Sequence, residues 1–112
     1  MGKVKKYEKY ILSILTEYAK IKYANLDAVN QLVSDKERHR YQIVTIGWDM
    51  EGKNVHDTPI HLDIINDKIW IQRNMTEIDF GQEFVGMGVP KSDIVIGFLA
   101  PEIREYSDYA VA

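Results

Sequence analysis

The chain has 112 residues, of which 46% are hydrophobic and 28% charged, a composition typical of one globular domain. It contains no cysteine, which excludes disulfides, thiolate metal sites and cysteine nucleophiles. The net charge is −3, but residues 1–24 carry a local balance of +4 and the remainder −7, so the acidic body does not resemble a nucleic-acid-binding domain. The N-terminus lacks the apolar core of a secretory signal, and no apolar run approaches the roughly 20 residues that span a bilayer. We therefore expect a soluble, cytoplasmic protein with no membrane partner.

The clearest periodicity lies near the N-terminus and predicts a helix over residues 3–23. Its apolar residues recur at alternating steps of three and four without an interrupting proline or glycine, at Val4, Tyr7, Ile11, Ile14, Tyr18 and Ile21. This narrow stripe allows two arrangements. The helix either packs on the sheet of its own domain or pairs across a dimer axis, and the stripe is too short to require a coiled coil.

Lysines gather at the start of this helix, at Lys3, Lys5, Lys6 and Lys9. The helix dipole disfavours cations in the first turn by about 0.3–1 kcal/mol each when they are exposed, so helix stability does not explain them. They either keep this end of the helix solvated, or they contact an acidic partner or the phosphates of DNA.

Four segments then have the composition and alternation of strands, over residues 29–35, 41–48, 55–65 and 68–73. Short polar turns join them. One contains Gly52, which is free to adopt a positive φ, and another is a two-residue hairpin connection at Asn66-Asp67. Pro59 lacks an N–H group, so it predicts an edge or a bulge in the third strand. Consecutive strands with short turns indicate an antiparallel meander.

Helical spacing returns over residues 76–88. Thr76 and Asp79 approximate a capping box at its start. Gly81 and Gly86 each cost about 1 kcal/mol inside a helix, so we expect close backbone packing at both positions.

The last third of the chain predicts a short strand over residues 94–98 and a helical turn over 102–107. Its final residues are rich in aromatics, unlike a disordered terminus, so we expect the C-terminus to dock into the fold. The whole chain, 1–112, is expected to be a single α+β domain. It combines a long N-terminal helix with a largely antiparallel five-stranded sheet, and places a second helix and a short C-terminal helix on one face.

One pair of residues has the chemistry of a reactive site. His61 and Asp63 are two apart on one predicted strand, so they point to the same face, and a carboxylate can fix the tautomer of a histidine. His56 has the opposite parity and cannot join them unless a bulge intervenes. Two ligands do not make a catalytic metal site, where three are usual, so we predict no metal and favour a structural, hydrogen-bonded His61.

Two further groups have the chemistry of protein interfaces. The charged turn before Tyr41 includes Arg38 and Arg40, which either form local ion pairs or form the rim of a partner-binding surface, since Arg and Tyr are favoured in interface hot spots. Trp48 and Trp70 lie on adjacent or nearly adjacent strands, where core or dimer packing is favoured over a base-stacking platform.

Taken together, several strings resemble the XisI family, in order and over nearly the whole chain. They are RYQIVTIGWD at 40–49, IHLDI at 60–64, KIWIQ at 68–72, GVPKSDIVIGF at 88–98, PEIREYSDYAVA at 101–112, and the end of the first helix at residues 14–19.

The resemblance implies a controlling factor for excision of the fdxN element, a DNA segment removed during heterocyst differentiation in cyanobacteria. Members of the family act alongside an XisH-like protein and a site-specific recombinase. The resemblance supplies no catalytic residue and no cofactor. We therefore expect a non-enzymatic homodimer that binds an XisH-like partner, with a contact surface at Arg38, Arg40, Tyr41, Tyr106 and Tyr109.

Two alternatives remain. One is direct DNA binding through the N-terminal lysines, and the other is a small enzyme that uses His61 and Asp63.

Overall fold

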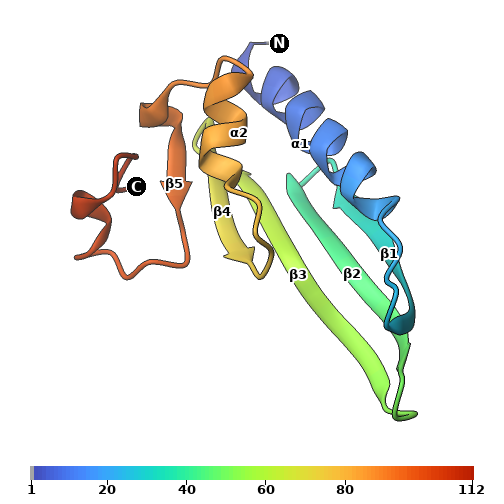
Figure 1. Ribbon diagram of the computed structural model, residues 1–112. Coiled ribbons are helices and arrows are strands. Elements are labelled where there is room, and N and C mark those ends of the chain that lie inside the picture. The colour runs from blue at the N-terminus through green and yellow to red at the C-terminus, as the bar shows by residue number, and fades with distance from the viewer. Residues whose placement is uncertain (1) are drawn as a thin grey trace.

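The computed structural model describes residues 2–112 and contains one five-stranded sheet with two helices on one of its faces (Figure 1). The elements follow in the order α1 (Lys3–Ala19), β1 (Leu26–Asp35), β2 (Arg40–Asp49), β3 (Asn54–Ile65), β4 (Lys68–Asn74), α2 (Phe80–Gly86) and β5 (Ile94–Ile96). One-turn 3₁₀ helices occur at Lys91–Asp93 and Arg104–Tyr106. This arrangement confirms the α+β class and the predicted order of elements. No helix among the described residues is long and apolar enough to cross a membrane.

The sheet has the order β1-β2-β3-β4-β5, with β1 to β4 forming the predicted antiparallel meander. Helix α2 connects β4 to β5, which therefore runs parallel to β4 and makes the sheet mixed. The tight turns use left-handed backbone: φ is 53° at Asn66 and 63° at Asp67, as a two-residue hairpin requires, and 81° at Gly52.

Pro59 marks a bulge, one of the two features predicted for it. The pairing of β2 with β3 passes from Ile43↔Ile60 to Thr45↔Asp57, so β3 holds one extra residue at this point. Because side chains alternate between the two faces of a sheet, the extra residue reverses the face to which the following side chains of β3 point.

The core lies between the helices and the sheet. Tyr7, Ile11 and Leu15 of α1 are buried against the strands, and Phe80 and Phe84 of α2 stack with ring centroids 6.4 Å apart. Burying each such side chain contributes about 1.5–3 kcal/mol. The apolar stripe of α1 thus packs on the sheet of its own domain, which is the first of the two predicted arrangements.

Helix α1 ends at Ala19 rather than at residue 23. Lys20 caps it, and the N–H of Ile21 donates to the carbonyl of Tyr18 in a tighter closing turn. The chain then reverses so that the Tyr23 hydroxyl donates to Asn30 on β1, at 2.9 Å. The helix therefore ends where residues 20–23 turn towards β1, and the spacing of apolar residues does not predict this hydrogen bond between Tyr23 and Asn30.

Helix α2 begins at Phe80 rather than at residue 76. Asp79 is its N-cap and accepts a hydrogen bond from the N–H of Gln82 at 3.1 Å. Thr76 instead accepts from the N–H of Ile78 at 3.1 Å, which forms a local turn before the helix. The predicted capping box was therefore wrong.

Close packing was predicted at two glycines of this helix and occurs at one. A Cβ at Gly81 would lie 2.5 Å from the Tyr109 hydroxyl, whereas a Cβ at Gly86 would meet open space. The absence of a side chain at Gly81 thus allows the C-terminal segment to approach α2.

The C-terminal segment docks on the sheet, as predicted. The N–H of Ala110 donates to the carbonyl of Ile94 at 2.8 Å, and the Arg104 guanidinium lies 5.1 Å from the centroid of the Trp70 ring. Trp70 points away from the core side that Ile69 and Ile71 occupy, so the C-terminal helical turn lies on the face opposite α1. This placement differs from the expectation that the second helix and the short C-terminal helix lie on one face.

Candidate functional site

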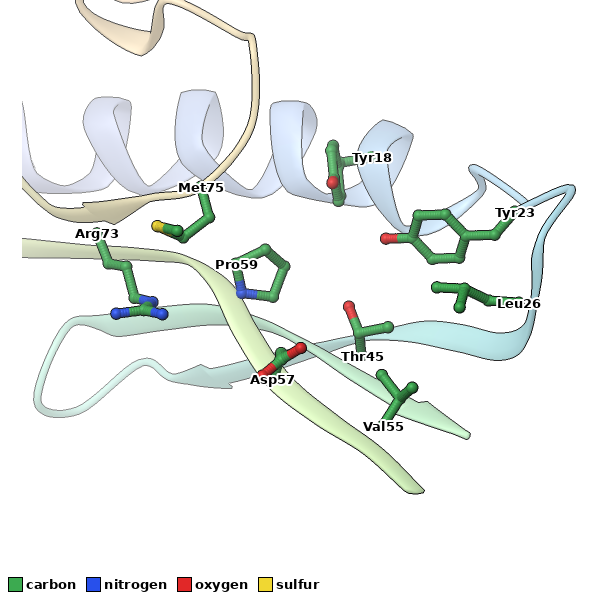
Figure 2. Close-up of a pocket in the computed structure, with 9 residues that line it drawn as sticks. All are labelled: Tyr18, Tyr23, Leu26, Thr45, Val55, Asp57, Pro59, Arg73 and Met75. Atoms are coloured by element: carbon green, nitrogen blue, oxygen red, sulfur yellow. The ribbon is translucent and has the colours of Figure 1, made fainter. Parts of the chain in front are cut away.

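A pocket lies between the C-terminal end of α1 and the strands beneath it, β1 to β4 (Figure 2). Its volume is about 350 Å³. Tyr18 and Tyr23 project into it from the helix side, and Thr45 rises from β2 below them. Val55 and Pro59 supply apolar wall from β3.

The hydroxyl groups of this pocket are organised by Asn30, a buried amide on β1. Its Oδ1 accepts from the hydroxyls of Thr45 at 2.7 Å and of Tyr23 at 2.9 Å. Burial, with the neighbouring Tyr23, raises the pKa of Tyr18 to about 12, so its phenol stays neutral at physiological pH. The pocket therefore offers apolar contact and neutral hydroxyls, which suit binding rather than proton transfer.

Charged groups stand at the other end of the pocket. Asp57 lies on β3 and Arg73 on β4, and both are exposed. The Arg73 Nε donates to the carbonyl of Thr58 at 2.8 Å, which fixes the guanidinium beside the opening. This end can accept a polar or charged group.

A second polar group lies on the opposite face of the sheet, centred on the buried carboxylate of Asp63. His61 Nε2 is 2.8 Å from its Oδ1, and Gln72 Nε2 donates to its Oδ2 at 3.2 Å. Arg40 lies directly opposite Asp63 on β2, with Nε 3.7 Å from Oδ1. The structure thus joins His61 and Asp63, as predicted, and adds Arg40 from the predicted contact surface.

Both ring nitrogens of His61 have neighbours within the protein, because Nδ1 lies 3.5 Å from Gln42 Nε2. Beside this cluster the indole Nε1 of Trp70 is buried, and it is the one such side-chain polar atom without a hydrogen-bond partner in residues 2–112. Within that same range no three His, Asp or Glu side chains gather as metal ligands would. The geometry matches the structural, hydrogen-bonded role favoured for His61.

His56 shares this face with His61, because of the bulge at Pro59. It lies opposite Ile46, whereas His61 lies opposite Gln42, and both partners point the same way on β2. Strand parity would place the two histidines on opposite faces only if β3 were regular. Their partners Ile46 and Gln42 are still four positions apart on β2, about 13 Å.

The charged turn between β1 and β2 is held by Asp35. Its Oδ1 accepts from the backbone N–H groups of Glu37 and Arg38, both at 3.0 Å, and Arg38 Nη1 lies 3.1 Å from Oδ2. Hydrogen bonds from Arg38, first from its backbone, lower the pKa of Asp35. Local ion pairing therefore organises this turn, while the Arg38 side chain remains largely exposed.

Tyr41 does not belong to an exposed contact surface. It is 0% exposed, and its hydroxyl donates to Glu8 on α1. Burial and this carboxylate raise the pKa of Tyr41. Tyr41 thus connects β2 to the first helix, and its role is packing.

The two tyrosines of the C-terminal segment also differ in exposure. Tyr106 is 81% exposed, whereas Tyr109 is half-buried against Gly81. Of the five predicted contact residues, Arg38, Arg40 and Tyr106 remain available on the surface.

The N-terminal lysines also divide into two kinds. Lys3 Nζ lies 3.2 Å from the buried carboxylate of Asp93, so this lysine forms an ion pair within the fold. Lys5, Lys6 and Lys9 are exposed on α1. At most these three offer free charge to an acidic partner or to phosphate.

One surface of the sheet was not predicted from the sequence. The face of β1 and β2 turned away from the helices, here called the open face, carries Asp27, Val29, Gln31, Val33 and Asp35 from β1 and Arg40, Gln42, Val44, Ile46 and Trp48 from β2. Four of its apolar side chains are among the exposed large hydrophobics, with Val29 at 59% and Trp48 at 53%. Alternate residues of a strand share a face, but alternation does not show which face the helices cover.

Comparison with known proteins identifies relatives over the full length of the chain. The family model of the XisI protein matches residues 1–111. The crystal structure of a XisI-like protein from Anabaena variabilis is 40% identical, with a TM-score of 0.89, 97% of this chain covered and 99% of that one. The crystal structure of fdxN element excision controlling factor XisI, also from Anabaena variabilis, is 29% identical with a TM-score of 0.84, and coverage is 99% of this chain and 100% of that one. No curated protein matches the sequence.

Proposed function

The chain belongs to the XisI family, and we propose that it is an accessory controlling factor for site-specific DNA excision of the fdxN-element type. It acts by protein–protein contact with an XisH-like protein, works as a homodimer, and has no catalytic role of its own.

The observation that carries this proposal is the similarity to the excision controlling factor XisI over essentially both whole chains. The likeness extends from α1 to the docked C-terminal segment. Both ring nitrogens of His61 have neighbours within the protein, which supports a structural role for this side chain rather than a chemical one.

The exposed residues Arg38, Arg40 and Tyr106 are the proposed contacts for the XisH-like protein. Arginine and tyrosine bury large, adaptable side chains and are frequent in interface hot spots. Arg40 and the C-terminal segment are linked by one row of side chains across the sheet. Arg40 lies opposite Asp63, and Asp63 lies opposite Trp70. Arg104 of the C-terminal segment then stacks on Trp70.

The test is coexpression with the XisH-like protein, followed by size-exclusion chromatography with light scattering. A joint peak whose affinity falls at least tenfold in Arg38→Glu and in Tyr106→Ser is the expected result. Lys20→Ala, at an exposed position on the opposite side of the sheet, is the matched control and should bind normally. Two separate peaks at micromolar concentrations would overturn the proposal.

Direct DNA binding is the second candidate, supported by the exposed Lys5, Lys6 and Lys9. Three phosphate contacts predict that log affinity falls with log salt concentration with a slope of about −2.7. Fluorescence anisotropy with a labelled duplex between 50 and 200 mM salt measures this slope. An affinity that does not change with salt, or that survives replacement of all three lysines by glutamine, would exclude this candidate.

A further inference from the structure

The pocket beneath α1 takes no part in the proposed partner contacts, and its polar end has a defined hydrogen-bond direction. Asn30 Nδ2 lies 3.5 Å from the carbonyl oxygen of Tyr18, which can only accept a hydrogen bond. The amide nitrogen of Asn30 therefore faces that carbonyl, and the amide oxygen faces the pocket side. This oxygen accepts from the hydroxyls of Thr45 at 2.7 Å and of Tyr23 at 2.9 Å.

The orientation of Asn30 determines what the two hydroxyl groups offer to a bound molecule. A hydroxyl has one hydrogen, and Thr45 and Tyr23 each direct theirs at Asn30. Only their oxygen lone pairs remain, so both groups act as acceptors towards the pocket. Asn30 is 8% exposed and Thr45 is 5% exposed, so water competes little for these bonds. This end of the pocket therefore favours a ligand that carries N–H donors.

Asp57 adds a negative charge to the same end. It lies directly opposite Thr45 in the β2–β3 register, and side chains paired in this way have Cβ atoms about 4.5–5.5 Å apart. Figure 2 shows its carboxylate beside the Thr45 hydroxyl, with the Tyr23 hydroxyl above them. Two hydroxyl oxygens and a carboxylate around one space match a protonated amine, which has three donors and no acceptor.

Arg73 supplies the opposite charge at the other end of the pocket. Its Nε donates to the carbonyl of Thr58 at 2.8 Å, which holds the guanidinium in place and leaves its two Nη groups for another partner. The ion pairs within residues 2–112 do not include one between Arg73 and Asp57. Figure 2 shows Pro59 between these two side chains. A guanidinium presented in this way binds a carboxylate through two parallel hydrogen bonds.

The wall between the two charged ends is largely apolar. It is formed by Leu26, Val55, Pro59 and Met75, together with the ring of Tyr18. The volume of about 350 Å³ is at the lower end of the roughly 300–1,000 Å³ found for small-molecule sites. The pocket therefore fits one small molecule that has an apolar part.

We propose that this pocket binds a free amino acid with a large apolar side chain. Asp57 and the hydroxyl oxygens of Thr45 and Tyr23 hold its ammonium group. Arg73 holds its carboxylate, and the apolar wall holds its side chain. The site goes beyond the proposed function, since it lies on the helix side of the sheet, away from the surface proposed for the XisH-like protein.

Other small molecules satisfy only part of this pattern. A simple amine leaves the Nη groups of Arg73 without a carboxylate, and a diamine sets a second cation against them. A carboxylic acid without an amine leaves Asp57 and the two hydroxyl oxygens without a donor. Because a site built for polar groups discriminates against molecules that leave those groups unpaired, the pocket should select molecules with both charges.

Isothermal titration calorimetry of the full chain with L-phenylalanine and with L-leucine tests the proposal. At least one of them should bind with a Kd below about 1 mM, as expected for a ligand of this size. Analogues of the tighter ligand then remove one group at a time. They are phenylpropionate or methylpentanoate without the amine, phenethylamine or isoamylamine without the carboxylate, and glycine without the side chain. Each should bind at least tenfold more weakly.

Two variants test the charged residues of the pocket, both of which are exposed and outside the core. Asp57→Asn and Arg73→Gln should each weaken binding of the tighter amino acid at least tenfold. Glu51→Gln and Arg38→Gln make the same kinds of change at exposed positions outside the pocket and should bind as the wild type does. Circular dichroism and thermal melts establish that each variant is folded.

Three results would each overturn the assignment of this pocket. They are a Kd above about 1 mM for both amino acids, an analogue that binds within tenfold of its parent amino acid, and wild-type affinity in either folded pocket variant. Calorimetry uses this chain alone, whereas the contact with the XisH-like protein is measured by coexpression. Failure of one proposal is therefore distinguishable from failure of the other.

Discussion

Replacement of Tyr7 by phenylalanine removes the hydrogen bond that ties α1 to the segment entering β5. The Tyr7 hydroxyl donates to Asp93, and both residues are buried, with 3% and 6% exposed. Lys3 also approaches this carboxylate, at 3.2 Å, but its ammonium group is largely in solvent. Phenylalanine keeps the ring in the core, so the change isolates one hydrogen bond to a charged acceptor.

A hydrogen bond to a charged group contributes about 1.5–3 kcal/mol. Because Asp93 retains Lys3, we expect the free energy of unfolding at pH 7 to fall by about 2 kcal/mol in Tyr7→Phe. At about 4 °C for each kcal/mol in a chain of this length, the melting temperature should fall by about 8 °C.

The effect also depends on pH. Burial alone would raise the pKa of Asp93, but the hydrogen bonds from Tyr7 and Lys3 outweigh it and hold this pKa below its ordinary value of 3.8. A carboxylate with a lowered folded-state pKa stabilises the fold above its unfolded value and loses that contribution as pH falls through the folded value. The difference between wild type and Tyr7→Phe should therefore be full above pH 4 and shrink below it.

Urea denaturation at pH 7 and at pH 3 measures both effects. Tyr10→Phe, at a half-buried position on the same helix, is the control and should change the unfolding free energy by less than about 0.5 kcal/mol, as surface-side substitutions usually do. A loss below 0.5 kcal/mol for Tyr7→Phe at pH 7, or a difference that stays constant into acid, would refute the reasoning.

Three further predictions concern the core, the tail and the polar cluster. Phe84→Ala should lower the unfolding free energy by about 3–5 kcal/mol in urea titrations, because the ring is fully buried, and a loss under 1 kcal/mol would contradict its place in the core. Gly81→Ala should displace the Tyr109 ring and make the C-terminal segment cleavable by limited proteolysis at concentrations that spare the wild type, whereas equal protection would mean that the segment does not depend on this contact. His61→Ala leaves Asp63 one hydrogen bond short and should cost about 1–3 kcal/mol in thermal denaturation, with no change in partner affinity; lost binding in a folded variant would revive a functional role for this histidine.

Periodicity and turn chemistry predicted most of the fold. The alternating pattern identified four strands, Asn66-Asp67 and Gly52 identified their turns, and Pro59 identified the bulge. These features depend on short-range backbone sterics, which local sequence specifies directly. The ends of the helices were less well predicted, because several neighbouring residues can serve as a cap and apolar spacing does not choose Lys20 or Asp79 among them.

The candidate sites show the same division. The spacing of His61 and Asp63 was enough to place them together, since alternate residues of a strand share a face. The position of Arg40 opposite Asp63 depends on the register of two strands, which residue spacing does not predict. The pocket beneath α1 depends on where that helix ends, which spacing does not predict either. The burial of Tyr41 likewise required Glu8, 33 residues away along the chain.

What the sequence determined by itself was therefore local: the strands, their turns, the apolar stripe of α1 and the sets of side chains that share a face. Only the tertiary structure decided which of those faces is covered. Alternation is symmetric between the two sides of a sheet, and the choice is made by the packing of α1 and α2 on one side and by the reach of the C-terminal segment on the other. That segment stops at β4 and β5, and for this reason Val29, Ile46 and Trp48 are left at the surface.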